Sequence, residues 1–465
     1  MGQAGRVTDV GDLLSATARA ATEYLEGLDE RPVGATVEPA ALAARIPADF
    51  PELALDDGDV LDELLTVVQD AVLATGSPRF FGFVIGGALP AAIAADWLTS
   101  TWDQNGGLYV AGPAAAALEA AAGRWIIGAL DLPRDSSFAI VTGCQMAHLT
   151  CLAAARHHVL AEQGWDVERD GLVGAPRIRV LVGAGVHVTV ARALRVLGLG
   201  EACIETVTAD EMGAMDADAL DRALDAHDGP TIVCAQLGEI NTGAMDPVAD
   251  LVDVAHEHGA WLHVDGAFGL WARASAALRP LVPGVEGADS WATDGHKMLN
   301  VPYDCGIALC AHPEAHGAAM GVHADYLMHS DDERRDGVDW TPDFSRRARG
   351  IALYAALRSL GRQGLEELID RCCSNARRMA AGIDRIDGAE VLNHIAYNQV
   401  LVGFGDDART AAVIDHLQRG GECWMAGTRW HDRDAMRISI TGYRTTAADV
   451  DRTVDAIREA VAATG

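Results

Sequence analysis

The stretch that decides the fold runs from Trp261 to Gly306 and reads WLHVDGAFGLWARASAALRPLVPGVEGADSWATDGHKMLNVPYDCG. Asp265 ends a short apolar run, where a buried carboxylate needs a cationic partner to offset its desolvation. Lys297 stands just before a second apolar segment, and a lysine amine in such a place can attack an aldehyde. A protonated pyridine nitrogen for Asp265 and an aldehyde for Lys297 are both supplied by pyridoxal phosphate, so this cofactor is our first hypothesis.

Each of these residues also has an ordinary alternative. Taken alone, Asp265 is as well explained as a structural carboxylate paired with a nearby cation, and Lys297 as a solvated lysine. The pair His296-Lys297 lacks the ligand spacing of a metal motif, so we expect no metal. Further pieces of the chain must therefore decide.

Composition limits the classes of protein that fit. The 465 residues are 49% hydrophobic and 22% charged, which is typical of a globular chain of two or three domains. The net charge of −31 argues against a nucleic-acid partner. Nine cysteines without paired metal-type spacing predict reduced thiols rather than disulfides. No secretion signal and no membrane-length apolar run is evident, so we expect a cytoplasmic protein with no membrane partner.

Hydrophobic periodicity divides the chain into three segments. Residues 1–76 predict an N-terminal helical arm, with helical spacing at 7–28 and at 60–73. Residues 77–349 alternate β-like and helical runs, which predicts a large α/β domain with a mainly parallel sheet. Residues 350–465 predict a small α+β domain that starts with helices at 351–360 and 365–383. Its last helix begins near Thr446, with Asp449 placed to complete a capping box. The charged segment 329–337 predicts an exposed loop, either a plain linker or a catalytic lid.

Strands of the large domain are expected at residues 138–141, 178–182, 231–235, 261–264 and 307–310. Ligands in such sheets bind at the carboxyl ends of the strands, where Asp265 and the turn from Thr142 to Gln145 both fall. That turn joins a strand to a helix, and free N–H groups at a helix start favour a phosphate. His187 also follows a strand and is placed to stack on an aromatic cofactor. Such turns and single histidines are common in proteins without this cofactor. Both assignments therefore need the support of Asp265, Lys297 and the other motifs.

Seven motifs make the chain resemble the group II pyridoxal-phosphate-dependent amino-acid decarboxylases. They occur in the family's order: SPRFFGFV at 77–84, TGCQMAHL at 142–149, HVTVARALRVLG at 187–198, HVDGAFG at 263–269, DGHKMLNVPYDCG at 294–306, SRRARGIALYAALRSLG at 345–361, and MRISITGYRTT at 436–446. The resemblance implies the fold of type I pyridoxal-phosphate enzymes, with a mainly parallel seven-stranded sheet. It also implies a homodimer with its active site at or near the subunit interface.

The resemblance assigns a role to each matching residue. Lys297 would form the Schiff base, Asp265 would pair with the pyridine nitrogen, and His187 would stack on the ring; these are the expected catalytic residues. The other expected cofactor contacts are Gly143, Cys144 and Gln145 at the phosphate turn, His296 near the phosphate, Ala267 against the ring, Asn241 near the ring hydroxyl, and Asp294. Expected substrate contacts are Phe81, Trp340 and Arg437, the last as a carboxylate-binding arginine. Phe81 and Trp340, like Phe80, Trp102 and Trp424, also fit ordinary packing, and as site residues they would suit an apolar or aromatic substrate.

Three departures from the family pattern bear on the reaction. The tyrosine that donates a proton after decarboxylation in the aromatic-amino-acid decarboxylases would fall near Gly337, and no tyrosine occurs between Tyr326 and Tyr354. The phosphate turn has Met146 where glutamate is common and His148 where asparagine or threonine is common.

Three functions therefore stay open. The first is decarboxylation of an L-amino acid to an amine. The second is an aminotransferase or a decarboxylating aldehyde synthase of the same fold, and the third is a pyridoxal-phosphate-binding protein without useful catalysis.

Overall fold

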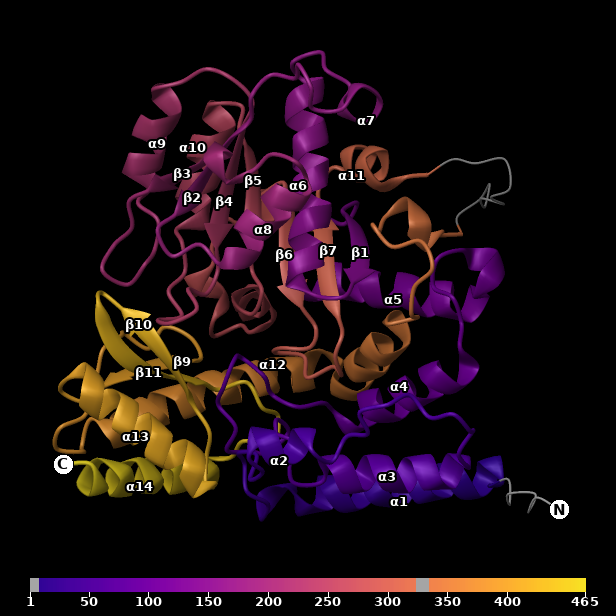
Figure 1. Ribbon diagram of the computed structural model, residues 1–465. Helices are drawn as coiled ribbons and strands as arrows, with labels where there is room; N and C mark the ends of the chain where they lie inside the picture. The colour runs from indigo at the N-terminus through magenta and orange to yellow at the C-terminus, as the bar shows by residue number, and fades with distance from the viewer. Residues whose placement is uncertain (1–7, 323–333) are drawn as a thin grey trace.

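The computed structural model describes residues 8–322 and 334–465, and its centre is a seven-stranded sheet (Figure 1). The strand order is β1-β7-β6-β5-β4-β2-β3, and all strands run parallel except β7. Their bounds are β1 Ser137–Val141, β2 Arg179–Gly183, β3 Ile204–Val207, β4 Thr231–Gln236, β5 Trp261–Asp265, β6 Ser290–Asp294 and β7 Gly306–Cys310. The predicted α/β architecture is confirmed, although the sequence patterns had not indicated β3 and β6.

Helices cover both faces of this sheet, which explains why its central strands are apolar on both sides. On β2, Val180 and Val182 belong to the cluster that includes buried residues of α6 and α8, whereas Leu181 belongs to the cluster that includes buried residues of α9 and α10. The long helix α6 crosses the sheet and contacts β1, β4, β5, β6 and β7 (Figure 1). The helices of this domain are α4 Pro90–Trp102, α5 Pro113–Ala129, α6 Cys144–Ala161, α7 Val167–Asp170, α8 Val188–Val196, α9 Ala217–Asp225, α10 Val248–Glu257 and α11 Pro313–Met320.

A four-stranded antiparallel sheet of order β10-β11-β9-β8 forms the C-terminal part. Its elements are α12 Gly350–Ile383, β8 Glu390–Val391, β9 Gln399–Gly403, α13 Asp407–Gly420, β10 Ala426–Trp430, β11 Arg433–Ser439 and α14 Ala447–Ala463. The two predicted helices at the start form one run with a break at Gly361, whose φ of 61° is not helical. Thr446 and Asp449 form the predicted capping box at the start of α14.

Short 3₁₀ helices connect these elements: η1 Gly27–Asp29, η2 Tyr109–Ala111, η3 Glu201–Cys203, η4 Gly269–Ala274, η5 Arg279–Leu281, η6 Val285–Gly287 and η7 Gly337–Asp339. In the described residues no helix combines the length and apolarity that crossing a membrane requires. All nine cysteines are buried free thiols. Most of the segment predicted as an exposed loop, 329–337, lies outside the described residues, which resume at Arg334.

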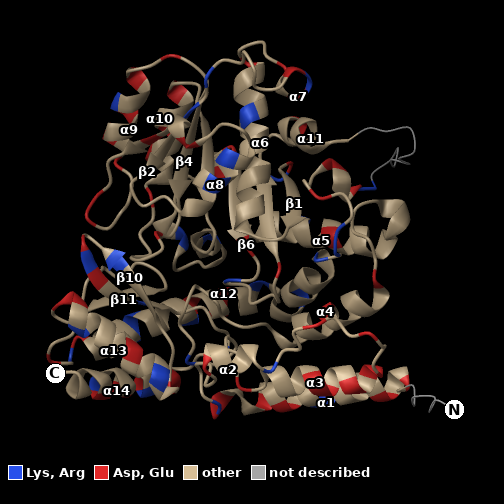
Figure 2. Cartoon of the chain, in the orientation of Figure 1, with Lys and Arg blue, Asp and Glu red and all other residues tan. Residues whose placement is uncertain are grey.

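The N-terminal arm consists of α1 Val10–Glu26, α2 Pro39–Ala43 and α3 Asp57–Val68. Helices α1 and α3 lie side by side at one edge of the molecule, and acidic residues are spread along both (Figure 2). Neither helix has a fully buried residue, and both expose apolar side chains, among them Leu14 at 54% and Leu64 at 55%. An amphipathic arm with an uncovered apolar face is expected to pack against something else.

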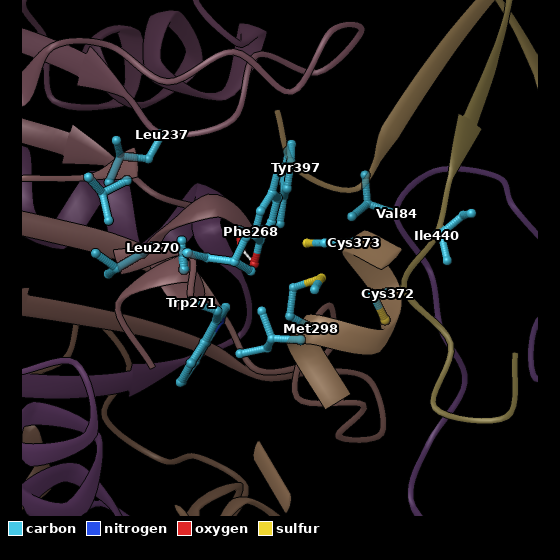
Figure 3. Close-up of a cluster of buried hydrophobic side chains, with 14 of the residues drawn as sticks. Val84, Leu237, Phe268, Leu270, Trp271, Met298, Cys372, Cys373, Tyr397 and Ile440 are labelled. Atoms are coloured by element: carbon cyan, nitrogen blue, oxygen red, sulfur yellow. Dashed lines mark hydrogen bonds between the residues drawn. The ribbon is translucent and has the colours of Figure 1, made fainter. Parts of the chain in front are cut away.

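A buried apolar cluster joins the two sheets and supports the segment that carries the predicted site (Figure 3). Phe268, just beyond β5, lies against Tyr397 from the C-terminal part, with 6.3 Å between ring centroids. The Tyr397 hydroxyl donates to the Phe268 carbonyl at 3.3 Å. Met298, which follows Lys297, is buried in the same cluster. The chain on either side of the predicted Asp and Lys is therefore anchored in the core.

Candidate cofactor site

A cavity of about 240 Å³ lies at the carboxyl ends of the parallel strands. Nine of the predicted site residues line it: Gly143, Cys144, Gln145, His187, Asp265, Ala267, Asp294, His296 and Lys297. These residues come from four separate stretches of sequence, and only the strand order brings them together. The structure therefore assembles most of the predicted set around one space.

Asp265 ends β5 and presents a buried carboxylate to this cavity. The backbone N–H of Ala267 donates to its Oδ1 at 3.1 Å, and the Nε2 of His148 lies 3.4 Å from its Oδ2. Burial raises the pKa of Asp265, but the opposing effects of His148, His187 and Lys297 are larger together. The net pKa of Asp265 therefore lies well below its ordinary value. The carboxylate is therefore ionised and ready to accept a hydrogen bond from a cation.

Lys297 lies between β6 and β7, with its ammonium 3.0 Å from the Oδ2 of Asp294. Burial lowers the pKa of Lys297, but the acidic groups around it, chiefly Asp294, outweigh burial and raise the net pKa. The amine must therefore lose a proton before it can act as a nucleophile. Lys297 is also the only lysine of the chain, because every other basic side chain apart from histidine is arginine.

The start of α6 forms one end of the cavity. Its N-cap residue is Gly143, which has no side chain to accept from the N–H groups of the first turn. The first of these, the Cys144 N–H, donates to the Oδ1 of Asp294 at 2.7 Å. His296 lies 3.4 Å from the same oxygen and accepts from the Cys305 N–H at its Nδ1, at 3.1 Å. Gly306 is required here, because a Cβ on it would lie 2.3 Å from the Gly143 carbonyl carbon. The helix start and the His296 ring together form an anion-binding end.

His187 is the N-cap of α8 and closes another side of the cavity. Its Nδ1 lies 2.7 Å from the Thr189 hydroxyl, which fixes the orientation of the ring. Burial lowers the pKa of His187, only partly opposed by Asp265. Gln145 ties α6 to this helix, because its Nε2 donates to the Thr189 carbonyl at 3.2 Å. The imidazole is therefore held neutral beside Asp265 and Lys297.

Four predicted residues do not line the cavity. Asn241 is engaged elsewhere, since it donates to Glu239 at 2.9 Å and accepts from Thr428 at 2.7 Å. Phe81 is fully buried in the core, and Trp340 packs edge-on against His316. Arg437 on β11 is near enough to His187 to influence its pKa.

Five lining residues were not identified from the sequence: Thr189, Gln236, Gly238, Ile240 and Phe268. Gln236 pairs with Asp265 in the register of β4 and β5, so the strand pairing would have indicated it. Gly238 has a φ of 94°, and a Cβ there would lie 2.6 Å from the Phe268 ring. Phe268 places its ring 5.9 Å from the Lys297 ammonium. A stronger sequence signal was the uniqueness of Lys297 itself.

Gly337, where the family's tyrosine would fall, is buried in η7. A Cβ at this position would lie 2.2 Å from the Nη2 of Arg346 and 2.5 Å from the Gly106 carbonyl oxygen. Arg346 is itself buried and pairs with Glu119 at 2.7 Å. The position therefore has no room for a side chain in this arrangement.

These groups fit pyridoxal phosphate: an ionised buried carboxylate for the pyridinium, one amine for the aldehyde, and a helix start with His296 for the phosphate. The family model of the pyridoxal-dependent decarboxylase conserved domain matches residues 39–405. Tryptophan decarboxylase 1 of Oryza sativa subsp. japonica is 28% identical over 469 residues, covering 93% of this chain and 90% of that protein. Phenylacetaldehyde synthase of a Rosa hybrid cultivar is 28% identical over 360 residues, covering 75% and 70%.

A solved structure is similar over the whole chain. The crystal structure of Oryza sativa TDC with PLP and tryptamine has a TM-score of 0.91 and 25% identity, and it covers 100% of this chain and 99% of that one. The chain therefore belongs to the pyridoxal-dependent decarboxylase family, carboxy-lyases of amino-acid metabolism whose cofactor is pyridoxal 5'-phosphate.

Proposed function

We propose that this protein decarboxylates an L-amino acid to an amine, with the cofactor attached through Lys297. The observation that carries the proposal is that the chain's only lysine and a buried, ionised carboxylate, Asp265, line the same cavity. When bound, the cofactor supplies an electron sink for the electron pair left on the substrate's α-carbon. Asp265 maintains this sink by holding a proton on the pyridine nitrogen.

The remaining lining residues bind and orient. Gly143, Cys144 and Gln145 offer the start of α6 to the phosphate, and His296 completes that end. Ala267 has a side chain small enough to leave the ring its place beside Asp265. His187 lies across from these groups and, being neutral, is able to accept or donate a proton at its free nitrogen.

The substrate is proposed to be an apolar or aromatic amino acid. Its α-carboxylate would face Arg437, whose buried Nε–H donates to no acceptor among the described residues. Burial lowers the pKa of Arg437, but nearby Glu239 opposes this effect. Phe268 and Ile240 supply the apolar part of the cavity wall.

A decarboxylating aldehyde synthase is the second candidate, and Gly337 is the observation that favours it. The position of the usual proton donor is a glycine packed against Arg346 and Gly106. Without that donor, His187 is our candidate for the proton-transfer group among the residues that line the cavity. The relative named phenylacetaldehyde synthase is consistent with such an outcome within the family.

We also propose a homodimer with its active site near the subunit interface. The exposed apolar residues of α1 and α3, including Val10, Leu14, Val60 and Leu64, support it, because such a surface is costly to leave in water. The buried free thiols suit a reducing cytoplasm.

Product analysis tests the proposal. Holoenzyme is incubated with pooled L-amino acids, and carbon dioxide, amine, aldehyde and keto acid are measured. Carbon dioxide with an equal amount of amine supports decarboxylation. Carbon dioxide with aldehyde, ammonia and hydrogen peroxide, formed as dioxygen is consumed, supports the second candidate. Keto acid without carbon dioxide would contradict both, and no product from any amino acid would favour a binding protein.

A further inference from the structure

A row of fully buried polar side chains leads from Asp265 into the core. His148 of α6 places its Nε2 3.4 Å from the Oδ2 of Asp265 and its Nδ1 2.9 Å from the Nε2 of His263. His263 of β5 continues the row, with its Nδ1 2.9 Å from the Ser290 hydroxyl of β6. The indole N–H of Trp261 donates to that hydroxyl at 3.0 Å. His148, His263 and Ser290 have no exposed surface and do not line the cavity.

The hydrogen bonds restrict where the protons lie. Burial lowers the pKa of His263 to about 3, so His263 is neutral and carries one hydrogen. If that hydrogen is on Nε2, it is donated to His148, and a neutral His148 must carry its own hydrogen on Nε2. If the hydrogen of His263 is on Nδ1, then His148 donates from its Nδ1 to the Nε2 of His263. The Nε2 of His148 would then face the Asp265 carboxylate without a hydrogen, unless that nitrogen is also protonated. In each favourable arrangement His148 Nε2 carries a hydrogen.

That hydrogen has two possible acceptors. The Oδ2 of Asp265 lies at 3.4 Å and the Cys144 sulfur at 3.5 Å, and the carboxylate is the stronger acceptor because it is charged. Cys144 also lies 4.0 Å from the Oδ1 of Asp265, too far for a strong hydrogen bond. The other ionisable groups that act on the carboxylate are His187 and Lys297, on the cavity side. His148 is thus the only one of these groups that reaches Asp265 from the core.

A metal ion is a poor alternative for this cluster. The ligand atoms of Cys144, His148 and Asp265 lie within 4.8 Å of one another. An ion among them would take Asp265 away from the cavity, and burial raises the pKa of the Cys144 thiol well above its ordinary value, which opposes the thiolate that a metal needs.

We propose that His148 is a positioning residue that donates its Nε2 hydrogen to Asp265 and so keeps the carboxylate ionised and aimed at the pyridine nitrogen of the cofactor. His263 and Ser290 support this role by fixing which nitrogen of His148 carries the hydrogen. The inference rests on the role proposed above for Asp265. It extends the site by one layer, to residues that touch neither the cofactor nor the substrate.

The test follows the proton on the cofactor itself rather than turnover. Wild-type protein, His148→Leu and His148→Gln are loaded with pyridoxal phosphate carrying ¹⁵N in the ring, and the nitrogen chemical shift is followed against pH. Leucine removes the donor, so the midpoint for loss of the ring proton is expected to fall by about one pH unit or more, which is about a tenfold change in proton affinity. Glutamine reaches the carboxylate with an N–H, so His148→Gln is expected to restore most of the midpoint.

Two further variants keep the outcome decisive. If His148→Leu does not fold, His148→Asn replaces it. The asparagine amide reaches His263 but is too short to reach Asp265, so the midpoint for loss of the ring proton must also fall in this variant. Asp265→Asn is the control for the proposed function and must lose the ring proton by itself. An unchanged midpoint in the His148 variants, with the proton lost in Asp265→Asn, would overturn this inference alone. A proton retained in Asp265→Asn would overturn the role of Asp265 as well.

Discussion

Replacing Gly337 tests whether the missing tyrosine is a matter of one residue or of the surrounding structure. A Cβ at this position would lie 2.5 Å from the Gly106 carbonyl oxygen, which is backbone, and 2.2 Å from the Nη2 of Arg346. Arg346 is 2% exposed and pairs with Glu119, which is 5% exposed, at 2.7 Å. Overpacking of a filled site costs about 1–3 kcal/mol, and complete loss of a buried ion pair by removal of one partner costs about 3–5 kcal/mol.

We therefore expect Gly337→Ala to lower the free energy of unfolding by about 2 kcal/mol, and Gly337→Tyr to lower it further. The measurement is chemical denaturation of the holoenzyme, with Gly317→Ala in α11 as the matched control. A Cβ on Gly317 has no heavy atom within 4 Å, so this control is expected to be neutral or slightly stabilising. Equal stability of Gly337→Ala and Gly317→Ala would refute the packing argument.

The same variants bear on the products. Because the tyrosine side chain has no room in this arrangement, Gly337→Tyr is expected to change the amine-to-aldehyde ratio only together with the loss of stability. A changed ratio in a variant as stable as wild type would mean that this segment adopts another arrangement in the working enzyme. An unchanged ratio in a folded Gly337→Tyr protein would remove the missing donor as the explanation of any aldehyde product.

Three other predictions concern the arm, the pH dependence of stability and the thiols. Leu14→Arg combined with Leu64→Arg is expected to halve the mass seen by light scattering, whereas the neighbouring exchange Glu63→Arg is not; a dimer that persists in the double variant would contradict the proposed interface. Burial and Arg335 lower the pKa of His316 to about 4, so the folded state favours a neutral His316. The free energy of unfolding is therefore highest above pH 6.5 and falls by about 3 kcal/mol as the pH falls through 4. The free energy of unfolding of His316→Gln should therefore depend less on pH in this window, and parallel curves would argue against the effect. All nine thiols should react with a thiol reagent only after unfolding, and rapid reaction of the native protein would show that the cysteines are more accessible than the structure indicates.

Local patterns in the sequence were sufficient for the α/β architecture, and the family resemblance supplied most of the residues that line the cavity. Asp265 and Lys297 were recognisable because a carboxylate and an amine beside apolar strands require a reason for their burial. The α1 and α3 helices and the capping box at Thr446 followed from periodicity and cap chemistry, although the helix limits differ by a few residues. The two boundaries between the three segments, at residues 76 and 349, remain a prediction.

What the sequence did not reveal depends on contacts between distant strands. Gln236 lies beside Asp265 only through the register of β4 and β5, and Asn241 turns away because Glu239 and Thr428 bind its amide. The buried row behind Asp265 was equally hidden, since His148 and His263 are 115 positions apart in the sequence. Single-residue reasoning noticed His148 as unusual without indicating its partner.

The central claim is that Lys297 holds the cofactor, and one measurement tests it directly. Holoenzyme is reduced with borohydride, digested, and mapped by mass spectrometry for the pyridoxyl adduct. Since Lys297 is the only lysine, the account predicts a single modified peptide spanning residue 297, and no adduct in Lys297→Ala. An unmodified Lys297 in fully loaded protein, or an adduct only on the terminal amine, would contradict it.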